Sequence, residues 1–259
     1  MKILVTGGAG FIGSHIVDRY IQDGHEVIVI DNLSTGKRAN LNPKARFYQI
    51  DIGSPEVEAV FEKERPEVLN HHAAQIDVRR SVADPTFDCK ENVLGFLNVM
   101  EPARRHGIKK VIFASSGGAI YGEQKEFPAT EDHPTNPISP YGVAKLTCEK
   151  YLHYYSVQYK IPYVIFRYAN VYGPRQNAEG EAGVVAVFIN KLLNNEQPVV
   201  NGDGKQTRDY VYVGDIAELN RRAVQLNSTQ CLNVGTGVET DVNQIFVLRF
   251  GLSAKHAAS

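Results

Sequence analysis

Short runs of almost uninterrupted apolar residues recur along the first two thirds of the chain, separated by segments with helical spacing. Strands with one face in water alternate apolar and polar residues, whereas strands covered on both faces are apolar throughout. The runs therefore predict strands of a parallel sheet that has helices on both sides. The predicted strands are KILVT (2–6), EVIVI (26–30), RFYQI (46–50), EVLNHHA (67–73), KVIFAS (110–115) and YVIFRY (163–168).

The segments between these strands have the apolar spacing of helices. We predict helices at 11–23, 55–64, 92–106 and 140–159. Pro102 interrupts the third of these, and because proline lacks an N–H donor, we expect that helix to kink or end there. Alternation of strand and helix from the first residue predicts a doubly wound α/β fold.

Composition excludes several classes of protein. The formal net charge of −1 and the even spread of charged residues give no surface for nucleic acid or anionic membrane, so we expect a small-molecule partner. Cys89, Cys148 and Cys231 lie far apart and form no C-x-x-C, which argues against a disulfide framework and a zinc site. No leader and no apolar run of about 18 residues is visible, and we expect a soluble, cytoplasmic protein without a metal.

A glycine-rich turn joins the first strand to the first helix. Gly7, Gly8, Gly10 and Gly13 lie where a chain can turn tightly, let a pyrophosphate approach the backbone, and let the helix pack closely. Free N–H groups and the helix dipole would then hold the anion. An ordinary tight turn also uses glycines, but this one follows a strand and opens a helix, which favours a dinucleotide site.

The second strand is followed by Asp31, about twenty residues after the glycines. A carboxylate there would accept hydrogen bonds from an adenosine ribose and would repel a 2′-phosphate. Although Lys37 and Arg38 follow closely, we predict NAD in preference to NADP. Asp51 and Ile52, after the third strand, are candidates to receive the adenine, and an ordinary aspartate at a strand end is an equally open interpretation.

The pattern loosens after about Arg167, where loops rich in glycine, asparagine and proline surround helices predicted near 183–194 and 214–226. We therefore predict an NAD-binding Rossmann domain at residues 1–166. Residues 167–259 would form a small substrate-binding lobe, with strands returning to the Rossmann domain. The sequence shows no internal repeat and no long linker, so we do not expect two independent domains.

A tyrosine and a lysine share one face near the start of the predicted helix at 140–159. Ser139 suits the cap of this helix and Pro140 its first turn, so Tyr141 and Lys145 stand at positions i and i+4. Such a pair is common and alone indicates little. The dinucleotide turn upstream and a pair of serines, Ser115–Ser116, at the end of a strand favour a catalytic pair.

The pair has a physical rationale. A phenol has a reference pKa of about 10, and lowering it by about three units requires about 4 kcal/mol of preferential stabilisation of the phenolate. A cation about 4 Å away supplies about that much at an effective dielectric constant of 20. Lys145 is one such cation, and the positive nicotinamide ring of NAD would be a second.

Seven motifs together carry a resemblance to a known family. They are TGGAGFIG (6–13), DNLSTG (31–36), HHAAQ (71–75), SSGGAIYGE (115–123), PYGVAK (140–145), RYANVYGPRQ (167–176) and RDYVYVGD (208–215). The sequence resembles the extended short-chain dehydrogenase/reductases, and within them the UDP-glucose (UDP-galactose) 4-epimerases. The glycine motif combined with Tyr-x-x-x-Lys is highly specific for the superfamily, and the epimerase assignment is less so.

The resemblance implies a role for each matching residue. Tyr141 would be the base, Lys145 would lower its pKa, and Ser116 would bind the reacting sugar hydroxyl, with Ser115 as its alternative. Asn170, Val185 and Arg208 would contact the UDP-sugar. The implied cofactor-binding residues are Gly7, Gly10, Phe11, Ile12, Gly13, Asp31, Asn32, Ser34, Gly36, Asp51, Ile52, Ala73, Ala74, Gln75, Asn92, Tyr141, Lys145 and Tyr168.

The implied reaction inverts C4 of a nucleotide sugar through a transient 4-keto intermediate, with NAD bound throughout. Related 4,6-dehydratases usually carry an Asp-Glu pair where Gly117–Gly118 stand, which favours epimerisation over elimination. A dehydratase, a decarboxylase or a truncated non-catalytic NAD-binding protein stays an alternative. Family members commonly dimerise through the helices that correspond to 92–106 and 140–159, so we expect a homodimer.

Two features depart from a simple match. Family members continue beyond the last residue of this chain, so we expect an altered or shortened C-terminal end at VLRFGLSAKHAAS (247–259) that weakens the substrate site. His71 and His72 would suit a metal or a general base, but no further ligand stands at the right spacing. We therefore favour packing beside the cofactor for both histidines.

Overall fold

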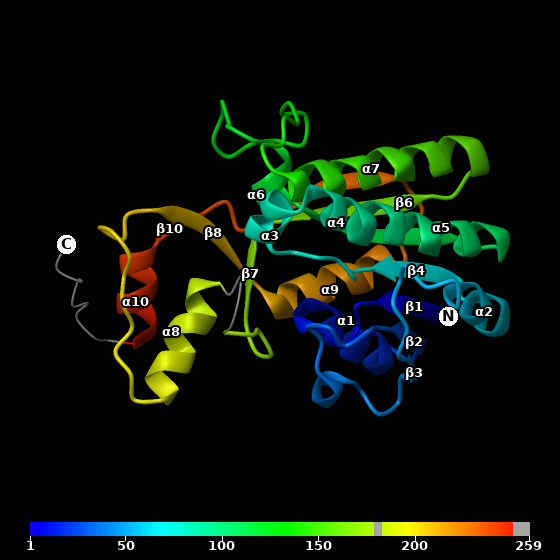
Figure 1. Ribbon diagram of the computed structural model, residues 1–259, viewed down its shortest axis with the longest axis horizontal. Helices are drawn as coiled ribbons and strands as arrows, with labels where there is room; N and C mark the ends of the chain where they lie inside the picture. The colour runs from blue at the N-terminus through cyan, green and yellow to red at the C-terminus, as the bar shows by residue number, and fades with distance from the viewer. Residues whose placement is uncertain (179–182, 251–259) are drawn as a thin grey trace.

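The computed structural model describes residues 1–178 and 183–250. A parallel sheet of seven strands runs through the molecule in the order β3-β2-β1-β4-β5-β6-β9 (Figure 1). The strand order reverses direction between β1 and β4. The strands are β1 (Lys2–Thr6), β2 (Glu26–Ile30), β3 (Arg46–Tyr48), β4 (Val68–His71), β5 (Lys110–Ser116), β6 (Tyr163–Tyr168) and β9 (Gln230–Val234).

Helices cover both faces of this sheet. On one face lie α2 (Val57–Glu64), α5 (Gly95–Arg105) and α7 (Pro140–Tyr159), and on the other lie α1 (Phe11–Gln22) and α9 (Val213–Ala223). Successive strand residues alternate between the two cores: Leu4 packs with the α2, α5 and α7 side, and Ile3 with the α1 and α9 side. Both faces of the sheet are therefore buried by a helical layer, which explains the continuous apolar runs. The predicted doubly wound α/β fold is confirmed.

A smaller lobe lies at one end of the sheet (Figure 1). It contains a second sheet, ordered β10-β8-β7, and a separate apolar cluster built around Phe188, Val200, Val242 and Phe246. Its elements are β7 (Asn170–Tyr172), α8 (Val184–Leu193), β8 (Thr207–Tyr212), β10 (Glu239–Asp241) and α10 (Val242–Phe250). Between them, α9 and β9 return to the large sheet, and β6 itself continues to Tyr168, past the expected boundary at 166.

The helix predicted at 92–106 differs most from expectation. The chain is already helical in α3 (Val78–Ala83) and α4 (Pro85–Cys89), passes through one π-helical turn at Lys90–Leu94, and then enters α5. The helix does not end at Pro102 but continues to Arg105, so of the two predicted outcomes, a kink or an end, the end was wrong. Phe96, Val99 and Met100 are fully buried on the same helix, and this packing outweighs the one hydrogen bond that the proline removes.

The remaining differences are small. The 3₁₀ turn at Arg38–Asn40 and the short α6 (Gly117–Ile120) were not predicted, β3 ends at Tyr48, and β4 ends at His71. Of the C-terminal end that we expected to be altered or shortened, residues 247–250 belong to helix α10, and residues 251–259 lie outside the described part of the chain. In residues 1–178 and 183–250, no helix is long and apolar enough to cross a bilayer.

Candidate active site

The carboxyl ends of β1 and β4 lie side by side at the point where the strand order reverses, which is where open α/β sheets bind ligands. Gly7 follows β1 with a φ of +70°, and a Cβ there would lie 2.7 Å from the Ala73 nitrogen. Thr6 Oγ1 accepts the N–H groups of both His72 and Ala73 at 3.2 Å. The two segments are thus in contact, and only glycine fits between them.

The N-terminus of α1 opens onto the same place. Gly10 caps this helix without a side chain, so the N–H groups of Phe11, Ile12 and Gly13 have no acceptor within the helix. A Cβ on Gly13 would lie 2.2 Å from the Gly7 oxygen, so the turn and helix pack as closely as backbones can. This arrangement fits a pyrophosphate, whose oxygens would accept those N–H groups.

Asp31 lies beside this turn and is 7% exposed. Its Oδ2 accepts the Ala9 N–H at 3.0 Å and its Oδ1 accepts the Leu33 N–H at 2.8 Å, which holds the carboxylate rigidly. A Cβ on Gly36 would lie 2.8 Å from Asp31 Oδ1, so a larger residue at position 36 would crowd the carboxylate. The fixed negative charge fits ribose hydroxyls and opposes a 2′-phosphate.

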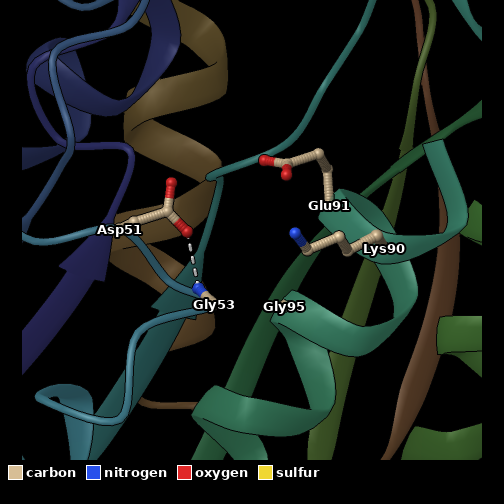
Figure 2. A pocket seen from close by; sticks show the side chains of 5 residues that line it. All are labelled: Asp51, Gly53, Lys90, Glu91 and Gly95. Carbon is tan, nitrogen blue, oxygen red and sulfur yellow. Dashed lines mark hydrogen bonds between the residues drawn. The ribbon is translucent and has the colours of Figure 1, made fainter. Parts of the chain in front are cut away.

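A pocket of about 250 Å³ lies next to the Asp31 segment. Figure 2 shows Asp51 on one side of it and Lys90 and Glu91 of the π-helical turn on the other. Asn32 Nδ2 donates to Asp51 Oδ2 at 2.6 Å, and Ser34 N–H donates to Asn32 Oδ1, so the predicted adenosine residues form one connected group. Asp51, which lines the pocket, is one of the two residues that the sequence offers as candidates to receive the adenine.

The chain after β4 is fixed to the π-helical turn by hydrogen bonds. The Gln75 N–H donates to Asn92 Oδ1 at 2.8 Å, and Asn92 Nδ2 donates back to the Gln75 carbonyl at 2.9 Å. Asn92 Nδ2 also donates to Asp88 Oδ1, and Asp88 Oδ2 has no hydrogen-bond partner among the described residues. Burial raises the pKa of Asp88. Sequence reasoning missed Asp88, because a single aspartate in a helix ordinarily indicates a surface charge.

Tyr141, Ser116 and Lys145 come together at the carboxyl end of β5. Ser139 accepts the Gly142 N–H at 3.1 Å and Pro140 opens α7, which places Tyr141 in the first turn as predicted. The Ser116 side chain lies close enough to the Tyr141 hydroxyl to lower its pKa. Lys145 is 5% exposed, its Nζ donates to the Ala114 carbonyl at 2.8 Å, and it lies 5.8 Å from the centroid of the Tyr141 ring.

The electrostatics of this group differ from the expectation. Burial raises the pKa of Tyr141 to about 12, and the nearby Ser116 side chain offsets only part of that rise. Burial also lowers the pKa of Lys145 to about 8. The phenol pKa is therefore set by desolvation of the phenolate, and the lowering that we expected from Lys145 is not seen. A second cation beside the phenol is needed to bring its pKa toward neutrality.

Ser115 and the two histidines have other partners. Ser115 donates to Glu149 Oε1 at 2.5 Å, away from the phenol, which leaves Ser116 as the serine at Tyr141. His71 stacks against Phe113 and lies 3.0 Å from Thr6 Oγ1, and burial lowers its pKa well below the ordinary value. Burial also lowers the pKa of His72 to about 3. Both rings are therefore neutral packing groups beside the crevice.

The hydroxyl of Tyr168, another expected cofactor residue, is buried and engaged. It accepts from Asn220 Nδ2 at 2.8 Å and lies 3.2 Å from His72 Nε2. Sequence reasoning did not find Asn220, because an asparagine inside an amphipathic helix gives no sign of a partner on a distant strand. No group of three or more potential metal ligands occurs within residues 1–178 and 183–250.

The expected substrate residues lie in the smaller lobe and not among the residues above. Asn170 is exposed at the start of β7, and Arg208 is exposed on β8, where its Nη1 donates to the Thr207 carbonyl. β7 and β8 pair with Asn170 opposite Tyr210, so Asn170 and Arg208 belong to one sheet. Val185 is buried in the first turn of α8. The three residues therefore belong to the same lobe, but no contact joins Val185 to the other two among the interactions of the described residues.

Comparisons with known proteins agree with this geometry. Residues 3–235 match the family model described as NAD dependent epimerase/dehydratase family. A UDP-glucose 4-epimerase of Mycolicibacterium smegmatis is 45% identical over 251 residues, which cover 95% of this chain and 80% of that protein.

Two solved structures superpose closely. The UDP-glucose 4-epimerase of Thermotoga maritima, solved with UDP-glucose, has a TM-score of 0.93 at 50% identity, and the match covers 96% of this chain and 81% of that one. The UDP-glucose 4-epimerase of Thermus thermophilus, solved with NAD, has a TM-score of 0.92 at 43% identity, and the match covers 99% and 86%. From its glycine turn, its Tyr141–Lys145 pair and these matches, we conclude that the chain belongs to the NAD dependent epimerase/dehydratase family.

Proposed function

We propose that this protein is an NAD-dependent 4-epimerase that interconverts UDP-glucose and UDP-galactose. The observation that carries the proposal is the grouping of Ser116, Tyr141 and buried Lys145 at the carboxyl end of the parallel sheet. The relatives named UDP-glucose 4-epimerase support UDP-glucose as one member of this pair. Asp31 supports NAD in preference to NADP.

In this reaction Tyr141 takes the proton of the sugar 4-hydroxyl, and Ser116 holds that hydroxyl through its own side chain. NAD, when bound, supplies a hydride acceptor for C4 and later the donor. Lys145 keeps a positive charge near the phenol and favours its ionised form. Asn170 and Arg208 hold the UDP portion while the 4-keto sugar turns to present its opposite face. Tyr141 then returns the proton to the inverted hydroxyl.

A dehydratase is the second candidate, and the residues after Ser116 argue against it. Elimination requires an acid and a base near C5 and C6 of the sugar. Gly117 and Gly118 open α6 directly after Ser116, and neither carries a side chain that could act. Formation of a 4-keto-6-deoxy product would establish the dehydratase and contradict the epimerase.

Tyr141→Phe tests the proposal because it removes only the hydroxyl that moves the proton. We expect conversion of UDP-galactose to UDP-glucose, followed by chromatography of the products, to fall by at least about a thousandfold while bound NAD is retained. Tyr155→Phe is the matched control, since Tyr155 is buried on the same helix and its hydroxyl donates to Glu101 at 2.7 Å. Full activity of Tyr141→Phe would refute the assignment.

We also propose the organisation that the family resemblance implies. Residues 1–166 would bind NAD and residues 167–259 the sugar nucleotide, and the protein would act in the cytoplasm. A homodimer would form through α5 and α7, because α7 exposes apolar and aromatic side chains. These are Val143, Tyr151, Tyr154, Val157 and Tyr159.

A further inference from the structure

A buried ion pair that the reaction does not use lies one helical turn beyond Lys145. Glu149 and Arg167 are 5% and 7% exposed. Arg167 Nη2 donates to Glu149 Oε2 at 2.8 Å, and its Nε donates to Oε1 at 3.2 Å. The Ser115 hydroxyl donates to the same Oε1 at 2.5 Å. One carboxylate on α7 is therefore held by the ends of two neighbouring strands, β5 and β6.

The remaining nitrogen of the guanidinium extends this contact to the chain that leads into α7. Arg167 Nη1 donates to the Tyr121 hydroxyl at 2.9 Å and to the Glu131 carbonyl at 3.2 Å. Tyr121 in turn donates to Asn233 Oδ1 on β9 at 2.6 Å. The group therefore ties together α7, three strands and the connection from α6 to α7, and every guanidinium nitrogen donates to protein.

The position of this group relates it directly to the proposed chemistry. Tyr141, Lys145 and Glu149 follow at intervals of four residues and so share one face of α7. Ser115 is the neighbour of Ser116 in β5. The Ser115 hydrogen bond to Glu149 therefore holds the helix that carries the phenol against β5, the strand that carries Ser116, and the ion pair with Arg167 holds the same helix against the neighbouring β6.

We propose that Glu149, clamped by Arg167 and Ser115, is a positioning residue that holds the Tyr141 hydroxyl beside Ser116. The proposal rests on the proposed function for its kinetic readout. Apolar residues of similar volume often stabilise a protein as well as a buried ion pair does. Stability alone therefore does not explain this ion pair, and in our proposal it fixes the position of α7. A displacement of about 1 Å at a reacting group can cost about a hundredfold in rate.

Glu149 has a second effect, on the charge of Lys145. Its carboxylate favours the ammonium form and counteracts the burial that lowers the pKa of Lys145 to about 8. Asp88 acts in the same direction from α4, and burial raises the pKa of Cys148 to about 12, so this thiol is neutral. The other titratable groups that face Lys145 are Tyr141, His71 and His72. Glu149→Gln therefore lets Lys145 lose its proton at a lower pH.

Two variants separate the positional effect from the charge. Glu149→Gln keeps the shape and removes the charge, and Ser115→Ala removes one hydrogen bond and leaves the ion pair. We expect Glu149→Gln to lower kcat for UDP-galactose about tenfold to a hundredfold with little change in KM, and to move the alkaline fall of kcat to lower pH. Ser115→Ala should lower kcat several-fold without moving that fall. Tyr155→Phe, which removes a buried hydrogen bond elsewhere on α7, should change neither.

A measurement without turnover completes the test. In NAD-loaded protein with ¹³C-labelled lysine, the Lys145 signal, assigned by its loss in Lys145→Arg, should titrate at a lower pH in Glu149→Gln than in the unchanged protein. If the unchanged protein converts no UDP-hexose, the proposed function fails and the positioning role fails with it, while this titration still tests the effect of Glu149 on the charge of Lys145. Wild-type kcat in both variants overturns the positioning role. Should Glu149→Gln not fold, wild-type kcat in Ser115→Ala overturns it.

Discussion

Lys145 brings an ammonium group into a site where only 5% of the residue is exposed. Its Nζ has the Ala114 carbonyl as a hydrogen-bond acceptor and lies 5.0 Å from the centroid of the Phe113 ring. Burial lowers its pKa from 10.5 to about 8, so holding the charge inside the folded protein costs about 3 kcal/mol at neutral pH. In the proposed reaction, the charge of Lys145 would therefore come at the expense of stability.

This cost predicts the effect of removing the charge. Lys145→Met keeps the length and the apolar stem, and should raise the free energy of unfolding at pH 7 by about 1–3 kcal/mol, the lost hydrogen bond offsetting part of the gain. Turnover should be lost. Urea denaturation at equal NAD saturation measures the change, and Lys150→Met, exposed on the same helix, should stay within about 0.5 kcal/mol of the unchanged protein.

The pH dependence of the unfolding free energy independently tests whether Lys145 destabilises the folded protein. Between about pH 8 and 10.5 the unfolded chain still binds a proton at Lys145 that the folded protein has lost, so this group makes the unfolding free energy rise with pH in that window. Below about pH 8 its contribution is constant and unfavourable. The difference between Lys145→Met and the unchanged protein should therefore shrink from pH 8 upward. A constant difference up to pH 10.5 would contradict the buried charge.

At the scale of single residues, the sequence indicates the residues that we propose to react but not those that hold them. Tyr141 and Lys145 could be found because their spacing and the cap at Ser139 are local features. Glu149 and Arg167 could not be paired, since a charge in a helix ordinarily indicates a solvated face and its partner lies on a strand. The same holds for the hydroxyl of Tyr168, whose partners His72 and Asn220 come from two other segments.

Among the elements, the glycine turn between β1 and α1 depends most on backbone contact. Gly13→Ala would place a Cβ 2.2 Å from the Gly7 oxygen, and neither backbone can yield without opening the turn. We expect this variant to lose bound NAD and about 1–3 kcal/mol of stability. Absorbance of the purified protein and release of nucleotide on heating measure the bound cofactor.

A second glycine near the same helix separates crowding from backbone strain. Gly24, just after α1, has a φ of +81°, and a Cβ added to it would meet nothing within 4 Å. Gly24→Ala should cost about 1–2 kcal/mol from its left-handed conformation and should retain NAD. Loss of NAD from both variants to the same degree would show that general destabilisation, and not the turn, controls binding.

The type of an element was predictable where burial on both faces of the sheet gave a short, continuously apolar run. β1, β2 and β6 match the predicted ranges because each is largely apolar and is bounded by polar or turn residues. The π-helical turn at Lys90–Leu94 was not predictable, because one added residue in a turn leaves no separate pattern. A helix end at Pro102 was wrongly allowed, because local propensity does not include the buried contacts of Phe96 and Val99.

For the molecule as a whole, α7 presents a surface that a monomer does not explain. Val143 and Val157 are 50% and 56% exposed along one helix, and three tyrosines of the same helix are exposed with them. Tyr154 and Tyr159 contact each other edge to face, and Arg104 of α5 lies 4.7 Å from the Tyr159 ring. A large apolar and aromatic face of this kind commonly marks a protein contact.

The homodimer that we propose would bury this face, and Val157→Glu tests it. A carboxylate at the centre of an apolar contact would lose its water without gaining a partner, so we expect the variant to sediment as a monomer at concentrations where the unchanged protein is a dimer. Val238→Glu is the matched control, because Val238 is 60% exposed but lies between β9 and β10, away from α7. Analytical ultracentrifugation distinguishes the species. A dimer that persists in Val157→Glu, or an unchanged protein that is already monomeric, would exclude α7 as the contact.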